Sequence, residues 1–111
     1  MSGDKGRPID EASRVIAAIE NLEQLEEILR DEGERNWISG VRAAKRAGME
    51  FLAVGNHSEA LASMASIFRT MHSGPGGFDD FFVWRASTAE RVEANRELKQ
   101  IKKDLWEHLR R

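Results

Sequence analysis

The sequence predicts an all-α fold, a compact single-domain four-helix bundle. Apolar residues recur every three or four positions in four separate segments, as they do along one face of a helix. Glycine, asparagine and serine separate these segments, and no polar–apolar alternation is long enough for a sheet. A length of 111 residues suits one domain. We expect a flexible N-terminus over residues 1–8 and a single helical domain over residues 9–111.

The first predicted helix follows Asp10, which serves as its N-cap, and runs to about Asp31. Gly33 supplies the left-handed residue that commonly ends a helix. The apolar stripe of this helix consists of residues three and four positions apart, namely Ala12, Val15, Ile16, Ile19, Leu22, Leu25, Ile28 and Leu29.

The second predicted helix is capped by Asn36 and runs from Trp37 to about Leu52. Gly40 and Gly48 each lower its helix propensity by roughly 1 kcal/mol relative to alanine. We therefore expect them to face a neighbouring helix and to permit a close approach. The cations of this segment fall on its outer face, where a solvated surface is the preferred interpretation over an anion site; they are Arg42, Lys45 and Arg46.

Ser58 and Glu59 are expected to open a third helix after Gly55 and Asn56 close the second. Its buried stripe comprises Leu61, Met64, Ala65, Phe68 and Met71.

A fourth helix is expected to begin at an N-cap provided by Ser87 or Thr88. Asn95 interrupts its apolar edge, so we expect Asn95 to face water or a partner. We expect Trp106 to cover the edge of the core or to be partly exposed. The apolar edge itself consists of Val92, Leu98, Ile101, Leu105 and Leu109.

The sequence GPGGFDDFFVW (residues 74–84) predicts a Gly/Pro-rich aromatic corner between the third and fourth helices. Asp79 or Asp80 can accept hydrogen bonds from nearby backbone N–H groups and fix the turn. The aromatic residues carry more apolar area than a small loop can expose, so several are expected to pack under the bundle; they are Phe78, Phe81, Phe82 and Trp84. The segment lacks the lysine of a phosphate-binding loop and the spaced ligands of a calcium loop.

Charge is unevenly distributed along a chain whose net charge is −2. Residues 20–34 contain seven acids and one base, whereas residues 85–111 contain eight bases and five acids. An acidic and a basic helix could lie together and neutralise each other. Alternatively, the acidic face could meet a basic partner, since complementary fields speed association.

The sequence offers no constellation that predicts catalysis. It has no cysteine, and its three histidines (His57, His72 and His108) are too scattered for a helical metal pair. We therefore expect no catalytic, cofactor-binding or metal-binding residue and no enzyme activity. No apolar run approaches the roughly 18 residues that span a bilayer, and no signal peptide is visible, so we expect a cytoplasmic protein.

The run IFRTMHSGPGGFDDFFVW (residues 67–84) resembles a corner in small bacterial helical proteins of immunity-like type. Their corner reads G-G-[MS]-G-S-[FL]-N-D and is followed by an apolar tail. Residues 76–78 match its glycines and aromatic residue, Asp80 matches its aspartate, and Asp79 replaces its asparagine. With Trp37 and GNHSEA upstream, the resemblance covers residues 36–100.

The resemblance implies a non-enzymatic protein of a toxin–immunity locus that binds a cognate toxin in the cytoplasm and neutralises it. A self-associating accessory protein and, less favoured, a nucleic-acid-binding regulator remain alternatives. The residues expected to contact a partner are acids of the first helix, the two corner carboxylates and two tryptophans, namely Glu23, Glu26, Glu27, Asp31, Trp37, Asp79, Asp80 and Trp106.

Overall fold

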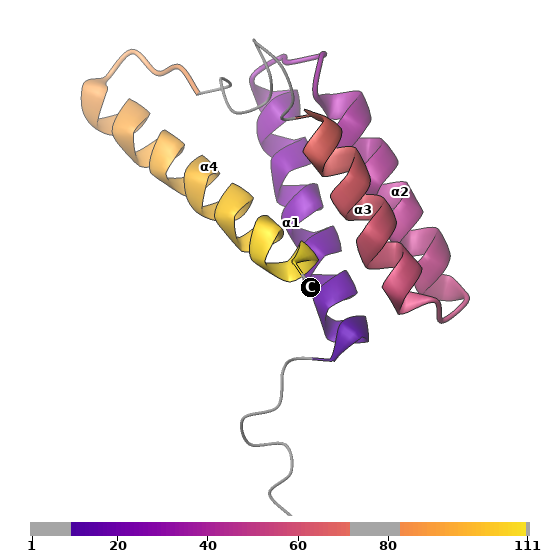
Figure 1. Cartoon of the computed structure of the whole chain (residues 1–111). Helices are drawn as coiled ribbons and strands as arrows, with labels where there is room; N and C mark the ends of the chain where they lie inside the picture. Colours follow the sequence, from indigo (N-terminus) through magenta and orange to yellow (C-terminus); the bar gives the residue numbers. More distant parts are fainter. Residues whose placement is uncertain (1–9, 72–82, 111) are drawn as a thin grey trace, which may run out of the picture.

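The computed structural model describes residues 10–71 and 83–110. Over these residues the chain forms four α-helices and no strand, which confirms the predicted all-α bundle (Figure 1). The helices are α1 (Glu11–Asp31), α2 (Ile38–Ala53), α3 (His57–Met71) and α4 (Thr88–Leu109). Most of the predicted corner, including Asp79, Asp80 and three of its four aromatic residues, lies outside the described residues, as does the predicted N-terminal segment.

Helix α1 occupies the middle of the bundle. It packs extensively against α2 and α4 and less against α3, while α2 and α3 form a closely packed pair. Helix α4 crosses α1 and touches α3 only lightly (Figure 1). The fold is therefore a three-helix unit with a fourth helix laid across its central member.

The core follows the predicted stripes. Leu22, Leu25 and Leu29 of α1 are fully buried, and Phe68 of α3 is among the largest fully buried side chains. Burying a side chain of this size contributes about 1.5–3 kcal/mol, so one continuous cluster of this kind is the main stabilising element of the fold.

Two residues expected in the core are exposed instead. Ile16 is 48% exposed and Val92 is 53% exposed. Ile16 is rotated about 100° around α1 from the buried Val15, and Val92 about 120° around α4 from the buried Leu98, so both side chains point away from the packed face. The apolar pattern correctly predicted the helices but overestimated the width of their buried faces.

The helix ends agree with the sequence at some positions and differ at others. The Asp10 carboxylate accepts a hydrogen bond from the backbone N–H of Ser13 at 2.9 Å, as predicted for an N-cap. The Ser87 hydroxyl similarly accepts from the N–H of Glu90 at 3.4 Å. Gly33 has a φ of +69°, which confirms the left-handed end of α1.

The predicted starts of α2 and α3 were each wrong. The N-cap residue of α2 is Trp37 rather than Asn36, and its side chain makes no capping hydrogen bond. The Glu34 carboxylate instead accepts from the backbone N–H groups of Asn36 and Trp37, just before the first residue of α2. The carboxylate also interacts favourably with the positive end of the helix dipole. At α3 the cap is Asn56, whose side-chain oxygen accepts from the N–H of Glu59 at 3.3 Å. Ser58 lies inside that helix.

The glycines of α2 lie against α3, as predicted. A Cβ atom on Gly40 would lie 2.9 Å from the sulfur of Met71, and one on Gly48 would lie 2.5 Å from the sulfur of Met64. No side chain at either glycine would fit without a shift of its methionine. The small residues on α2 therefore set the close spacing of α2 and α3.

Candidate partner-binding surface

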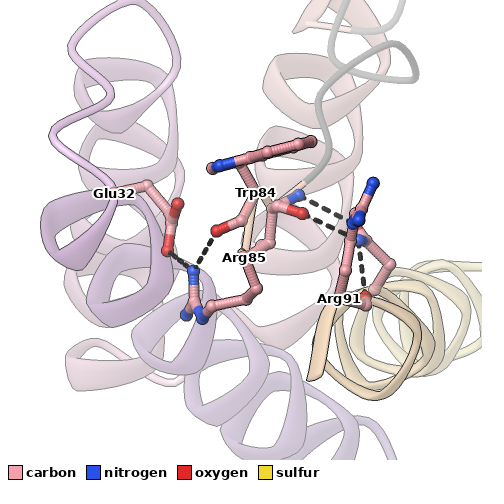
Figure 2. Close-up of polar contacts among 6 residues, drawn as sticks. Glu32, Trp84, Arg85 and Arg91 are labelled. Carbon is pink, nitrogen blue, oxygen red and sulfur yellow. Dashed lines mark hydrogen bonds and ion pairs between the residues drawn. The ribbon is translucent and has the colours of Figure 1, made fainter. Parts of the chain in front are cut away.

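Successive residues of the segment that enters α4 have different surroundings. Val83 is only 2% exposed and joins the core, whereas Trp84 is 61% exposed. Arg85 turns back toward α1 and pairs with Glu32 (Figure 2). We call residues 83–85 the α4 strap.

Asn95 of α4 fixes the first residue of the α4 strap. Its side-chain oxygen accepts from the backbone N–H of Val83 at 2.7 Å, and its amide nitrogen donates to the backbone oxygen of Val83 at 2.8 Å. The same nitrogen also donates to the backbone oxygen of Arg91 at 2.8 Å. The expectation that Asn95 faces water or a partner was therefore wrong. A primary amide carries a donor and an acceptor side by side, so one asparagine side chain can bond both the N–H and the C=O of a single backbone residue.

Arg85 fixes the other end of the α4 strap. Its Nη1 donates to a Glu32 carboxylate oxygen at 2.6 Å and to the backbone oxygen of Trp84 at 2.7 Å. The Glu32 side chain is only 16% exposed, so this pair is less screened by solvent than an ordinary surface pair. The α4 strap is thereby tied to the end of α1.

Trp84 projects between these two anchor points and is accessible to solvent. The guanidinium carbon of Arg91 lies 4.4 Å from the centroid of its ring, within the range of a cation–π contact. Tryptophan and arginine are the residues most enriched among those that dominate binding at protein interfaces. Trp84 is therefore the most accessible of the three tryptophans, whereas the sequence predicts that Trp37 and Trp106 contact a partner.

The other two tryptophans serve the core more than the surface. Trp37 is half-buried at the start of α2 and packs against the core cluster. Trp106 lies 4.8 Å from the ring of Phe68, with a tilted geometry of 54°. No local pattern in the sequence distinguishes these roles, because Trp84 belongs to an aromatic run of which several members are expected to pack inward.

A groove between α1 and α4 brings together two of the predicted acidic residues. Its volume is about 190 Å³, and Glu27 and Asp31 line it from α1, while Glu97 lines it from α4. Glu32 and Arg85 close one part of it, and the apolar wall consists of Ile28, Val83 and Ala94. We call this the acidic groove. None of Glu27, Asp31 and Glu97 forms an ion pair with any residue that the structure describes.

Glu97 was missed because it belongs to the predominantly basic last segment of the sequence. A signal was available, since Glu90, Glu97 and Asp104 are seven residues apart and therefore share one flank of a helix. The structure turns that flank toward α1 at Glu97. The acidic helix α1 and the predominantly basic helix α4 do pack together. At this groove, however, acidic residues of both helices lie side by side.

Glu26 differs from its neighbour Glu27. Its carboxylate accepts from Lys45 at 2.6 Å and from Arg42 at 2.9 Å, so it joins α1 to α2. The hydrogen bonds from Lys45 and Arg42 lower the pKa of Glu26, although partial burial acts in the opposite direction. Glu26 is thus engaged within the protein, and two of the three cations expected on a solvated face of α2 are its partners. Glu23 is exposed on α1, one turn before Glu27.

The described residues contain no group of three or more histidine, aspartate or glutamate side chains that could hold a metal ion. Nor does any helix among them combine the length and apolarity needed to cross a membrane. No protein-family model, curated protein or solved structure matches the chain. The acidic groove, with the neighbouring Trp84, is the surface that the geometry supports as a candidate site.

Proposed function

We propose that this protein is a non-enzymatic, immunity-type binding protein that neutralises a cognate protein toxin in the cytoplasm. The observation that carries the proposal is the acidic groove, where Glu27, Asp31 and Glu97 converge and none of them forms an ion pair with a described residue. Arg85 is already held by Glu32, so Glu27, Asp31 and Glu97 remain to meet cations of a partner. Such a surface can occlude a basic cleft and needs no chemistry of its own.

The geometry of the surface suits rapid and selective association. A concentrated negative field accelerates the encounter with a basic partner, and it repels acidic ones. Trp84 offers a large rigid side chain for the centre of a contact, and the α4 strap holds its backbone in place through Asn95 and Arg85. A preorganised surface of this kind loses less conformational entropy when it binds.

The test is co-expression with the product of the neighbouring gene, followed by cell survival. We expect rescue by the natural chain and loss of rescue by the double variant Asp31→Asn/Glu97→Gln, which alters both walls of the acidic groove. The matched control is Glu50→Gln/Glu107→Gln, which removes the same charge from exposed positions elsewhere. A harmless neighbouring product, or equal killing with and without this protein, would contradict the proposal.

A second candidate is self-association, and the exposure of two apolar side chains favours it. Trp84 is 61% and Val92 is 53% exposed, so each leaves apolar surface that a second copy of the chain would cover. Sedimentation velocity over a range of salt concentrations distinguishes the two. A dimer held by apolar contacts persists at high salt, whereas a complex steered by the acidic groove weakens.

A further inference from the structure

A second groove, on the opposite flank of α4, has a different chemistry from the acidic groove. It lies between α3 and α4, where these helices touch only lightly, and its volume is about 450 Å³. We call it the α3–α4 groove. Its lining residues are Ala62, Ala65, Arg69, Trp106, Leu109 and Arg110.

The floor of the α3–α4 groove is apolar and firmly supported. Ala65 and Leu109 belong to the buried core, and Trp106 is held against the fully buried Phe68. The hollow exists because α3 presents alanines at Ala62 and Ala65, whose side chains end at Cβ and leave the space beyond them empty. This floor is therefore concave, and its shape is set by residues that have little freedom to move.

The rim of the α3–α4 groove is basic. Arg69 and Arg110 are both exposed, and no acidic residue lines the groove. Lys99 and Lys103 precede Trp106 by seven and three residues, so they continue this basic edge along the same side of α4. None of these four cations forms an ion pair with a described residue. Helix α4 thus presents Glu97 to the acidic groove on the side of α1 and its share of these bases on the side of α3.

We infer that the α3–α4 groove docks an acidic amphipathic helix from a partner protein. A helix fits because a groove between two helices with an apolar floor accepts an apolar ridge at positions i, i+3, i+4 and i+7. The acidic character follows from charge complementarity, since carboxylates flanking that ridge would lie against Arg69, Arg110 and Lys103. This surface is separate from the acidic groove and does not depend on the proposed function.

Other occupants fit these features less well. A nucleic acid backbone would contact exposed cations but would leave the concave apolar floor unfilled. A membrane surface requires apolar side chains that protrude, whereas Trp106 and Leu109 form the bottom of a hollow. A second copy of this chain has an acidic helix in α1, but the apolar face of α1 is already buried in its own core.

The test uses the full chain and a synthetic peptide of 18 residues, labelled with fluorescein, with leucines on one helical face and glutamates elsewhere. The control peptide has the same composition in scrambled order. We expect saturable binding of the patterned peptide by fluorescence anisotropy and at least about tenfold weaker binding of the scrambled one. The double variant Arg69→Glu/Arg110→Glu should weaken binding of the patterned peptide by about tenfold or more.

The matched control variant is Arg30→Glu/Arg46→Glu, which changes the net charge equally at exposed cations outside the α3–α4 groove. We expect its affinity to stay within about twofold of the natural chain. A groove-filling variant, Ala62→Phe, should also abolish binding while circular dichroism shows an unchanged helical content. If either variant fails to fold, chemical-shift mapping of the natural chain decides, because the peptide should shift the Ala62, Ala65 and Trp106 signals.

Several results would overturn the inference. They are equal binding of the scrambled peptide, equal loss in the control variant, shifts that map elsewhere, and no saturable binding at millimolar peptide. Tighter binding to phosphatidylserine vesicles or to duplex DNA than to the peptide would assign the rim to a different ligand. Dimerisation that Ala62→Phe disrupts would assign the groove to a second copy.

Discussion

The side chain of Asn95 satisfies both backbone polar groups of Val83, accepting from its N–H at 2.7 Å and donating to its carbonyl at 2.8 Å. Val83 is buried, so its N–H and C=O would otherwise be removed from water without partners. One polar residue in the middle of a helix therefore fixes the entry of the chain into α4. The orientation of Trp84, the next residue, depends on it.

The first prediction concerns this pair. Replacing Asn95 by aspartate keeps the acceptor for the Val83 N–H but sets a carboxylate against the carbonyls of Val83 and Arg91. We expect Asn95→Asp to lower the free energy of unfolding by about 2–3 kcal/mol in urea titrations. The control Gln100→Ala removes an exposed amide of the same helix and should change stability by less than about 0.5 kcal/mol. Equal effects of the two substitutions would contradict the role assigned to Asn95.

The second prediction concerns pH. The pKa of Glu26 is lowered mainly by the hydrogen bonds from Lys45 and Arg42, so its charged form is favoured in the folded state. The stability that it contributes is present above the ordinary value of 4.5 and is lost as pH falls through the lower folded pKa. We expect Glu26→Gln to reduce the unfolding free energy by about 1 kcal/mol at pH 7 and by progressively less in acid.

Glu27→Gln is the matched control for this measurement, because Glu27 forms no ion pair with the described residues. The free energy of unfolding of Glu27→Gln should keep the pH dependence that the ion pairs of Glu26 give the natural chain. A difference between Glu26→Gln and the natural chain that stays constant as pH falls would show that the ion pairs do not stabilise the fold.

The third prediction concerns the close contact of α2 and α3. Alanine at Gly48 would improve helix propensity by about 1 kcal/mol but would force the buried Met64 to move. Because Met64 is fully buried, we expect Gly48→Ala to destabilise the protein by about 1–3 kcal/mol overall. The double variant Gly48→Ala/Met64→Ala should lose less unfolding free energy than the sum of the losses of the two single variants. The added methyl then occupies space that the sulfur has left. Simple additivity of the two effects would contradict the contact.

The fourth prediction separates the tryptophans. Trp106→Ala should lower the unfolding free energy by about 2–3 kcal/mol, because Trp106 packs on Phe68 at the edge of the core. Trp84→Ala should lower it by no more than about 1 kcal/mol, the size of an exposed cation–π contact. Urea titrations of both variants provide the test. A larger loss from Trp84→Ala than from Trp106→Ala would reverse the roles proposed for them.

The sequence predicted the helices well because the signals for them are local. The three- and four-residue spacing of apolar side chains, Asp10 as a cap and Gly33 as a terminator depend only on neighbouring positions. The two helix starts that were predicted wrongly differ from the observed starts, Ile38 and His57, by one residue each. Several neighbouring residues in these turns are polar and suit a cap, so the local pattern does not select one of them.

The candidate site was less predictable because it is assembled from distant positions. The acids at Glu27 and Asp31 were recognised, but Glu97 joins them only through the crossing of α1 and α4. Asn95 looked like a polar interruption because its partner, Val83, is twelve residues away. Likewise, nothing in the local pattern distinguishes Glu26, which binds two cations of α2, from Glu27, which binds none that the structure describes.

The packing of Met64 and Met71 against the glycines of α2 makes the protein sensitive to oxidation of these two methionines. A thioether that gains an oxygen becomes larger and polar, and neither change fits the space above Gly40 or Gly48. While the helices are closed, the fully buried sulfur of Met64 is shielded from peroxide. If α3 separates from α2 and Met64 is oxidised to the sulfoxide, the two helices cannot pack again as before. Oxidised protein would therefore accumulate with each opening until a reductase restores the methionine.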